Sequence, residues 1–320
     1  MRFAPSFRFL TLIALACLAA FPAARAAESK KTLRVGFAQT GAESVWRTAN
    51  TDSMKSEAEK RGIDLRFSDG QGKPENQIRA VRSFITQKLD AIVIAPVVVT
   101  GWEQVLREAK NARIPVIIMD RKVTVSDDSL YAAFIGSDFF TEGAMVADWL
   151  AKNAGARRRI VELQGTPGSS AALERKRAFA TGMAKHGDFK IIDTQTANFS
   201  RAEGKQVMEA LLKKHGRAIE ILYAHNDDMA FGAIQAIEEA GMKPGQDIVI
   251  VSIDGGREAV KAVADGKINC TVECNPLFGP KVYDAIEKIL KGEAVPKESY
   301  NKDELFDATN AAAAVPLRKY

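Results

Sequence analysis

The stretch Val35-Gly-Phe-Ala-Gln-Thr-Gly-Ala-Glu-Ser-Val-Trp-Arg47 decides how the whole chain is interpreted. It begins as an apolar strand, breaks at Thr40-Gly41, and continues into a helical segment that we expect to end at Gly62. Polar side chains and one indole therefore gather just past the carboxyl end of a strand, which is where ligands bind in an open α/β sheet. The residues placed there are Glu43, Ser44, Trp46 and Arg47.

Apolar runs and helical patterns alternate along the rest of the chain. Ala91–Val97 is a continuous apolar run, as expected for a parallel strand covered on both faces. Pro74 suits the first turn of a helix that carries Ile78, Val81 and Ile85 on one side. Such alternation indicates βαβ units and parallel sheets. The other predicted strands are Leu65–Ser68, Val116–Met119, Tyr131–Gly136, Arg159–Leu163, Lys190–Thr196, Ile219–Tyr223 and Asp247–Ile253.

The length of the chain predicts more than one hydrophobic core. At 320 residues it exceeds the usual size of a single core. No Pro/Gly/Ser-rich linker or low-complexity tract divides it. We therefore predict an α/β protein of two doubly wound parallel-sheet lobes, joined by short crossings.

Residues 1–26 are typical of a cleavable export signal. Arg2 and Arg8 supply positive charge, Phe9–Phe21 is almost entirely apolar, and Ala24-Arg25-Ala26 has the small-x-small form of a cleavage site. The apolar run is shorter than the roughly 20 residues that span a bilayer. Lipidation at Cys17 is an alternative, although the residues before it fit such a site poorly.

Removing this segment also removes most of the positive charge. The formal charge of +5 falls to +2, because Arg2, Arg8 and Arg25 leave and no acid goes with them. A nearly neutral chain without a basic patch is a poor nucleic-acid binder. We expect no nucleic-acid partner.

No cofactor or metal site is expected either. The glycine-rich loop Gly165–Ser170 lacks the phosphate-loop pattern, and Gly36 and Gly41 do not form G-x-G-x-x-G. The three histidines are spread along the chain without metal-ligand spacing. On one extended strand, Cys270 and Cys274 would lie ~13 Å apart, beyond the ~7 Å limit for a disulfide. Two free thiols are expected, although a turn between them would permit pairing.

Polar residues follow several other predicted strands, and each has a structural explanation. Asp and Asn at such positions serve as helix N-caps or turn formers. Arg121 and Arg175 would singly be surface charges, Trp46 would be a packing residue, and Glu43 would favour its helix through the dipole. The strand-end residues are Asp120, Asn226, Asp227, Asp228 and Asp254.

Together these side chains suit a sugar. Sugar hydroxyls both donate and accept hydrogen bonds, so carboxylates can accept their protons while Arg and Asn donate to their oxygens. An indole can cover the apolar C–H face of the ring. Because unpaired polar groups are costly in a closed cleft, such a site discriminates between stereoisomers.

Several motifs resemble the periplasmic sugar-binding proteins of the ribose-binding class, which have the type I periplasmic binding protein fold. They are Val35–Gln39, Met119-Asp120-Arg121, the segment from Gly165 to Arg175, Ala224–Met229 and Ile253-Asp254-Gly255. Four further stretches are similar to the galactofuranose-binding members of that class. These are Gly41–Arg47, Ser68–Gln71, Glu75–Phe84 and Ala95–Glu103.

The resemblance implies a periplasmic capture protein that delivers a monosaccharide, galactofuranose or a related aldose, to the inner-membrane permease of an ABC importer. It implies a monomer with three interlobe crossings. One lobe would hold residues 27–137 and about 274–300, and the other 138–273 and about 301–320. The implied ligand contacts are Glu43, Ser44, Trp46, Arg47, Asp120, Arg121, Arg175, Asn226, Asp254 and Glu273. Glu273 stands where the class has a glutamine, and a one-residue shift of that match stays open.

Three other functions remain. A repressor of the lactose-repressor family shares the fold but carries a helix-turn-helix where this chain has an export signal. A secreted glycoside hydrolase would need Glu43 and Asp120 about 5–10 Å apart across the scissile bond. The same binding module could instead report its ligand to a chemoreceptor or sensor kinase.

Overall fold

The computed structural model describes residues 1–4 and 32–320. The chain divides into the units Met1–Lys31 and Thr32–Tyr320, and the second contains every helix and strand given below. The predicted export signal lies outside the described residues, apart from the first four. Within the described part, no helix is both long enough and apolar enough to span a membrane.

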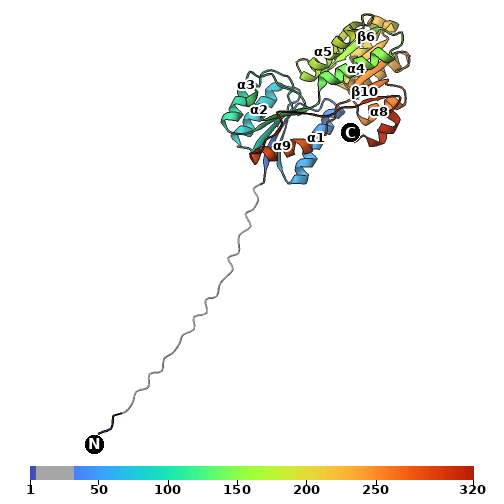
Figure 1. Ribbon diagram of the computed structural model, residues 1–320. Helices are drawn as coiled ribbons and strands as arrows, with labels where there is room; N and C mark the ends of the chain where they lie inside the picture. The colour runs from blue at the N-terminus through green and yellow to red at the C-terminus, as the bar shows by residue number, and fades with distance from the viewer. Residues whose placement is uncertain (5–31) are drawn as a thin grey trace. The chain divides into compact units, whose positions relative to one another are not determined.

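Two six-stranded sheets form the framework of Thr32–Tyr320 (Figure 1). The first has the order β11-β5-β4-β3-β1-β2 with every pair parallel. Its strands are β1 (Arg34–Gln39), β2 (Asp64–Asp69), β3 (Ala91–Ile94), β4 (Val116–Met119), β5 (Ala133–Gly136) and β11 (Glu298–Tyr300).

The second sheet repeats this pattern in the order β12-β10-β9-β8-β6-β7, and only β12 runs antiparallel to its neighbour. Its strands are β6 (Arg159–Gln164), β7 (Lys190–Thr196), β8 (Ile221–Ala224), β9 (Val249–Asp254), β10 (Cys270–Glu273) and β12 (Leu305–Asp307). In each sheet the direction in which successive strands are added reverses beside the first strand. The reversal lies between β1 and β3 in the first sheet and between β6 and β8 in the second. Ligands bind at such switch points.

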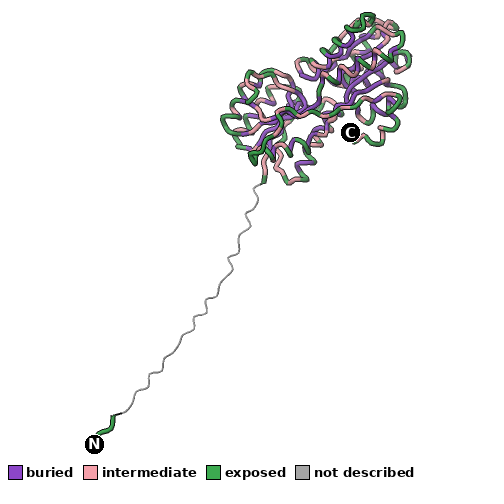
Figure 2. Tube along the Cα trace, viewed as in Figure 1, coloured by how far each residue is buried: buried purple, intermediate pink, exposed green. Residues whose placement is uncertain are grey.

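Helices cover both faces of the first sheet because its central strands, β1, β3, β4 and β5, are buried on both sides. Val93 packs with α1 and α9, whereas Ile92 and Ile94 pack with α2 and α3. This alternation follows from the period of two along a strand, and Figure 2 shows the strands as buried tracks between more exposed helices. The helices are α1 (Val45–Arg61), α2 (Pro74–Thr86), α3 (Glu103–Asn111) and α9 (Gly279–Leu290).

The second sheet has its own set of helices. Helices α4 and α5 contact each other, as do α6 and α7, and α8 contacts β10 and β12. These helices are α4 (Phe139–Asn153), α5 (Ser170–Ala184), α6 (Arg201–His215), α7 (Asp227–Glu239), α8 (Arg257–Ala264) and α10 (Ala311–Ala314). The chain passes between the sheets three times, after β5, after β10 and after β11. The predicted fold class, two doubly wound lobes joined by three crossings, is confirmed.

One strand is shorter than its apolar run predicts. The run Ala91–Val97 continues past the end of β3 at Ile94, because side chains take over the backbone hydrogen bonds there. The Gln77 amide donates to the Ala95 carbonyl at 2.7 Å and accepts from the Val97 N–H at 2.9 Å. The chain is thereby turned out of the sheet toward the interlobe region.

Cys270 begins β10 and Cys274 follows its end, and both are buried free thiols. The prediction of two unpaired cysteines is confirmed. Burial raises the pKa of both thiols well above the usual value.

Candidate ligand-binding site

Nearly all of the predicted site residues line one cavity at the carboxyl ends of the strands of both sheets. The lining includes every predicted contact except Glu273, together with Phe139, Ala171, Phe199 and Cys274. From the first sheet come the segment after β1 and the residues after β4; from the second come α5 and the ends of β8 and β9. The two switch-point edges thus share one site.

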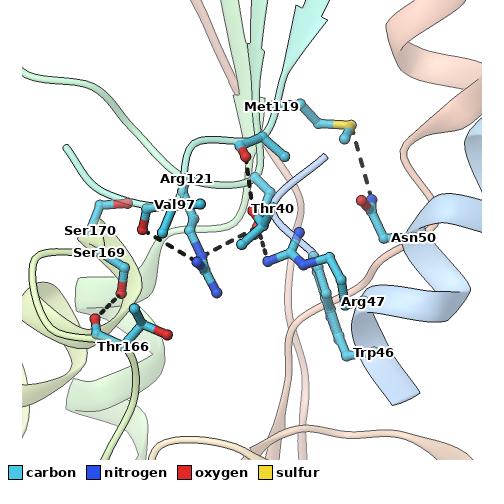
Figure 3. Close-up of polar contacts among 12 residues, drawn as sticks. Thr40, Trp46, Arg47, Asn50, Val97, Met119, Arg121, Thr166, Ser169 and Ser170 are labelled. Atoms are coloured by element: carbon cyan, nitrogen blue, oxygen red, sulfur yellow. Dashed lines mark hydrogen bonds and ion pairs between the residues drawn. The ribbon is translucent and has the colours of Figure 1, made fainter. Parts of the chain in front are cut away.

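Four charged side chains interlock on the first-sheet side. The Arg47 guanidinium contacts Glu43 Oε1 through Nε at 3.1 Å and Asp120 Oδ2 through Nη2 at 2.8 Å. Arg121 Nη2 lies 3.3 Å from the same Glu43 oxygen. Figure 3 shows Arg121 beside the Val97 carbonyl, with Arg47 and Trp46 approaching from the start of α1. The cluster presents guanidinium donors and carboxylate acceptors within a few ångströms of each other.

Burial and neighbouring charges set the ionisation of this cluster. Burial raises the pKa of Glu43, but Arg47 and Arg121 together outweigh it, so the net pKa lies below the usual value. Burial and the adjacent Arg47 lower the pKa of Arg121 to about 10. Glu43 is therefore a carboxylate and Arg121 a cation at neutral pH. One oxygen of Glu43, Oε2, is buried without a hydrogen-bond partner among the described residues.

Asp120 and Asp254 occupy matching positions with unusual backbones. Asp120 follows β4 with φ of 63°, and Asp254 ends β9 with φ of 133°. Both angles lie where residues with a side chain are rarely found. Such strain accumulates at functional sites, where the surrounding structure enforces it. Here it turns a carboxyl into the cavity from each sheet.

Arg175 is the guanidinium contributed by the second-sheet side. It projects from α5, is 3% exposed, and donates to Glu142 Oε2 at 2.8 Å and to the His225 carbonyl at 2.6 Å. Its Nη2 lies 3.8 Å from Asp254 Oδ1. Burial, with the charges of Asp227 and Asp228, raises the pKa of Asp254 well above its usual value, although Arg175 opposes this.

Asn226 has the structural role that its position after a strand suggested. Its side-chain oxygen accepts from the Met229 N–H at 3.0 Å as the N-cap of α7, and its amide donates to the Phe199 carbonyl at 3.2 Å. It lines the cavity while it holds Phe199 in place. A Cβ at Gly165 would lie 1.9 Å from the Phe199 ring, so that ring rests directly on the glycine.

Trp46 is tied to the crossing between β10 and α9. Its Nε1–H donates to the Cys274 carbonyl at 2.5 Å. Its ring has the Arg47 guanidinium 4.6 Å from its centroid and Phe278 in an edge contact at 6.3 Å. Ser44 accepts from the Arg47 N–H at 3.1 Å as the N-cap of α1. Trp46 thus links the start of α1 to a crossing.

The remaining strand-end acids and Glu273 serve the scaffold around the cavity. Asp227 accepts from the Ser252 and Thr271 hydroxyls at 2.5 and 2.9 Å. Asp228 accepts from the Val45 N–H at 2.7 Å, a contact between the two lobes. The Glu273 carboxylate faces the chain end, with Arg318 Nη1 2.8 Å from Oε1. The structure places Glu273 outside the cavity lining, and its neighbour Cys274 lies within it.

Sequence reasoning missed Phe139, Phe199 and Cys274. Phe139 follows the N-cap Asp138, and the Arg175 guanidinium lies 5.1 Å from its ring centroid. Phe199 lies 5.0 Å from the Arg121 guanidinium. Gly165 was a usable signal, since a glycine after a strand can mark a close approach. These two rings supply apolar faces beside the cations of the site.

The space between these side chains is about 20 Å³, enough for about one water molecule. A larger ligand can enter only if the lobes or the ion pairs move apart. A wider cavity of about 510 Å³ adjoins it and shares Trp46 and Asp254 with it. In the described part of the chain, no group of three or more His, Cys, Asp or Glu side chains is arranged to hold a metal ion.

Comparison with known proteins shows close relatives. The family model for a periplasmic binding protein domain matches residues 35–294. The galactofuranose-binding protein YtfQ of Escherichia coli K12 is 51% identical over 83% of this chain and 85% of its own length. The ribose import binding protein RbsB of Salmonella typhimurium LT2 is 35% identical over 76% of this chain and 80% of its own.

Solved structures agree with these relatives. The crystal structure of a galactofuranose binding protein has a TM-score of 0.87 at 49% identity, covering 90% of this chain and 98% of that one. The periplasmic component of the arabinose ABC transporter from Shewanella sp. ANA-3, bound to α- and β-L-arabinofuranose, has a TM-score of 0.86 at 49% identity. That match covers 89% of this chain and 95% of the other.

Proposed function

The chain belongs to the periplasmic binding protein family, and from that premise we propose that it captures a monosaccharide for an ABC importer. The proposed ligand is galactofuranose or a related aldose. The names of the galactofuranose-binding and arabinofuranose-bound relatives support this choice. The observation that carries the proposal is the single cavity in which three carboxyl groups, three guanidinium groups and two phenyl rings meet.

The chemistry of this cavity suits sugar hydroxyls. Arg47, Arg121 and Arg175 can donate hydrogen bonds to hydroxyl oxygens. Glu43 and Asp120 can accept hydrogen bonds from the hydroxyl groups. Hydrogen bonds to charged groups contribute about 1.5–3 kcal/mol each. The phenyl rings of Phe139 and Phe199 can cover a C–H face. We propose all the predicted contacts as ligand-binding residues except Glu273, whose place Cys274 takes.

Capture requires movement of the lobes. The site has contributions from both sheets, and the space at its centre holds about one water. A hinge at the three crossings would admit the sugar and close on it, to an extent set by the sugar's preference for the closed form. The Asp228 contact with the Val45 N–H joins the lobes in the closed arrangement.

The lobe boundaries in our proposal follow the two sheets. One lobe comprises residues 27–137 and about 274–300, and the other 138–273 and about 301–320. We propose a monomer, exported to the periplasm by the signal at residues 1–26 and docking on an inner-membrane permease. No cofactor or nucleic acid takes part.

Binding without catalysis is the favoured activity. A glycoside hydrolase built on Glu43 and Asp120 would need one of these two carboxyl groups kept protonated as the general acid. The pKa of Glu43 is instead lowered by Arg47 and Arg121, against the effect of burial, and Asp120 is ion-paired to Arg47 at 2.8 Å. Incubation with p-nitrophenyl galactofuranoside should release no nitrophenol; steady release would establish a hydrolase.

A thermal-shift screen of the protein without residues 1–26 tests the proposal. Sugars that bind only the folded state raise the unfolding temperature by mass action. We expect D-galactose and L-arabinose, whose solutions contain furanose forms, to raise it in proportion to the logarithm of concentration. No shift with any aldose up to millimolar concentration would refute capture of a monosaccharide.

A further inference from the structure

The Arg175 guanidinium is fixed along two of its edges by groups that do not line the cavity. Its Nε donates to Glu142 Oε2 at 2.8 Å, and its Nη1 donates to the His225 carbonyl at 2.6 Å. The remaining Nη2 is the atom near Asp254, at 3.8 Å from Oδ1. Rotation of the guanidinium fork, the planar group of Nε, Nη1 and Nη2, would break one of these bonds. Its free donors therefore face one direction, toward Asp254.

The packing of α4 against α5 places Glu142 beside Arg175. A Cβ at Gly143 would lie 2.7 Å from the Arg175 carbonyl, and a Cβ at Gly182 would lie 2.4 Å from the Ala147 Cβ. These glycines allow the two helices to approach closely, as the adjacent ribbons in Figure 1 show. Glu142 is fully buried in the first turn of α4.

We propose that Glu142 is a positioning residue that aims the Arg175 fork at the sugar. This inference rests on the proposed function, because it assumes that Arg175 contacts the ligand. Glu142 itself does not line the cavity, but it bonds Arg175 and interacts with Cys274, and both of these residues do. The Arg175→Gln background separates the effect that passes through Arg175 from any effect through Cys274.

A purely stabilising role for Glu142 fits the structure less well. A buried ion pair stabilises a fold only when its remaining polar atoms are satisfied, and Glu142 Oε1 has no hydrogen-bond partner among the described residues. Burial raises the pKa of Glu142 to about 7 even though Arg175 opposes the shift, and the nearby Asp303 adds to it. The gain from this pair therefore lies in orientation more than in folding energy.

A double-mutant cycle on sugar affinity tests this role. Titrations with D-galactose at pH 8, where Glu142 is ionised, compare wild type, Glu142→Gln, Arg175→Gln and the double variant. Glu142→Gln should weaken binding at least 10-fold alone but less than 2-fold in the Arg175→Gln background. Equal losses in both backgrounds, or no loss in wild type, would overturn the proposal.

A matched control removes a neighbouring charge without touching the fork. Glu174 lies on α5 beside Arg175, is solvent-accessible, and pairs with Arg177. Glu174→Gln should change affinity by less than 2-fold. Should Glu142→Gln fail to fold, Glu142→Asp replaces it. That variant keeps the charge but shortens its reach, so wild-type affinity in it would equally overturn the proposal.

A second readout does not need the sugar. The Arg175 Nε–H signal, identified by its loss in Arg175→Gln, can be followed by ¹⁵N NMR in the ligand-free protein at pH 8. It should exchange slowly in wild type and Glu174→Gln and broaden or vanish in Glu142→Gln. An unchanged signal would overturn the positioning role. A wild type that shows this signal but binds no sugar would refute the proposed function alone.

Discussion

Replacing Asp254 with glycine should make the protein more stable and its ligand binding weaker. Asp254 has a backbone φ of 133°, a region that glycine enters without strain. Among the described residues, its carboxyl forms an ion pair with Arg175, at 3.8 Å. Its backbone carbonyl still accepts from the Cys274 N–H at 3.0 Å, and glycine would keep that bond. Little that supports the fold is lost.

The expected size follows from opposing contributions. Relief of backbone strain should raise the free energy of unfolding by about 1–3 kcal/mol. The greater flexibility of glycine in the unfolded chain should lower it by about 0.5–1 kcal/mol. A net gain of about 1 kcal/mol raises the unfolding temperature by about 2–4 °C. Loss of the Asp254 hydrogen bond, which leaves a buried sugar hydroxyl without its partner, costs about 1–3 kcal/mol of binding energy, which is a roughly 5- to 150-fold loss of affinity.

Thermal unfolding and calorimetric titration of the same preparations would measure both effects. Asp254→Asn is the matched control, because it keeps the strained backbone and a side chain of the same size while an amide replaces the carboxyl. It should unfold at a lower temperature than Asp254→Gly. A glycine variant less stable than wild type would contradict the strain at Asp254, and wild-type affinity for D-galactose would contradict its contact with the sugar.

Three further variants test other parts of the account. Burial raises the folded-state pKa of Glu142 to about 7. Between about pH 4.5 and 7 the folded state therefore binds more protons than the unfolded chain. The free energy of unfolding should fall as the pH rises through that window. In that window the unfolding temperature of Glu142→Gln should vary less with pH than that of wild type. Burial lowers the pKa of His225, so His225 makes the folded state more stable as the pH rises, and it does so equally in both proteins. An identical pH dependence would contradict this assignment. Trp46→Phe should lose about 1–2 kcal/mol of stability and about 10-fold in sugar affinity, since the buried Cys274 carbonyl loses its shorter hydrogen bond and keeps only the 3.5 Å contact with the Tyr320 hydroxyl among the described residues. Unchanged values by denaturant titration and calorimetry would show that the Trp46 bond is unimportant. Asp228→Ala removes an interlobe hydrogen bond and should weaken affinity severalfold while small-angle scattering shows a more open form; an unchanged scattering profile would contradict its role in closure.

The sequence predicts the framework because its signals are local. Continuous apolar runs such as Val116–Met119 coincide with buried parallel strands, and the alternation with helical segments yields the two sheets. The convergence of the charged strand ends also follows from topology, since parallel strands bring their carboxyl ends to one edge.

What the sequence could not show depends on contacts between distant segments. The chain end folds back so that Arg318 pairs with Glu273, and no local pattern predicts that partner. Glu142 lies within an ordinary helix and gains its role only through the close packing of α4 on α5. Asn226 shows a second reason why the sequence could not decide a residue's role, because it caps a helix and lines the cavity at the same time. The two interpretations of a strand-end residue were not exclusive.

The most direct test of the central claim is an NMR spectrum of [1-¹³C]-D-galactose with the protein lacking residues 1–26. Furanose and pyranose anomeric carbons resonate at different positions, so the bound ring form can be read directly. We expect a bound signal at the furanose position that is lost in Arg175→Gln. A bound pyranose, or no bound sugar at millimolar concentration, would contradict it.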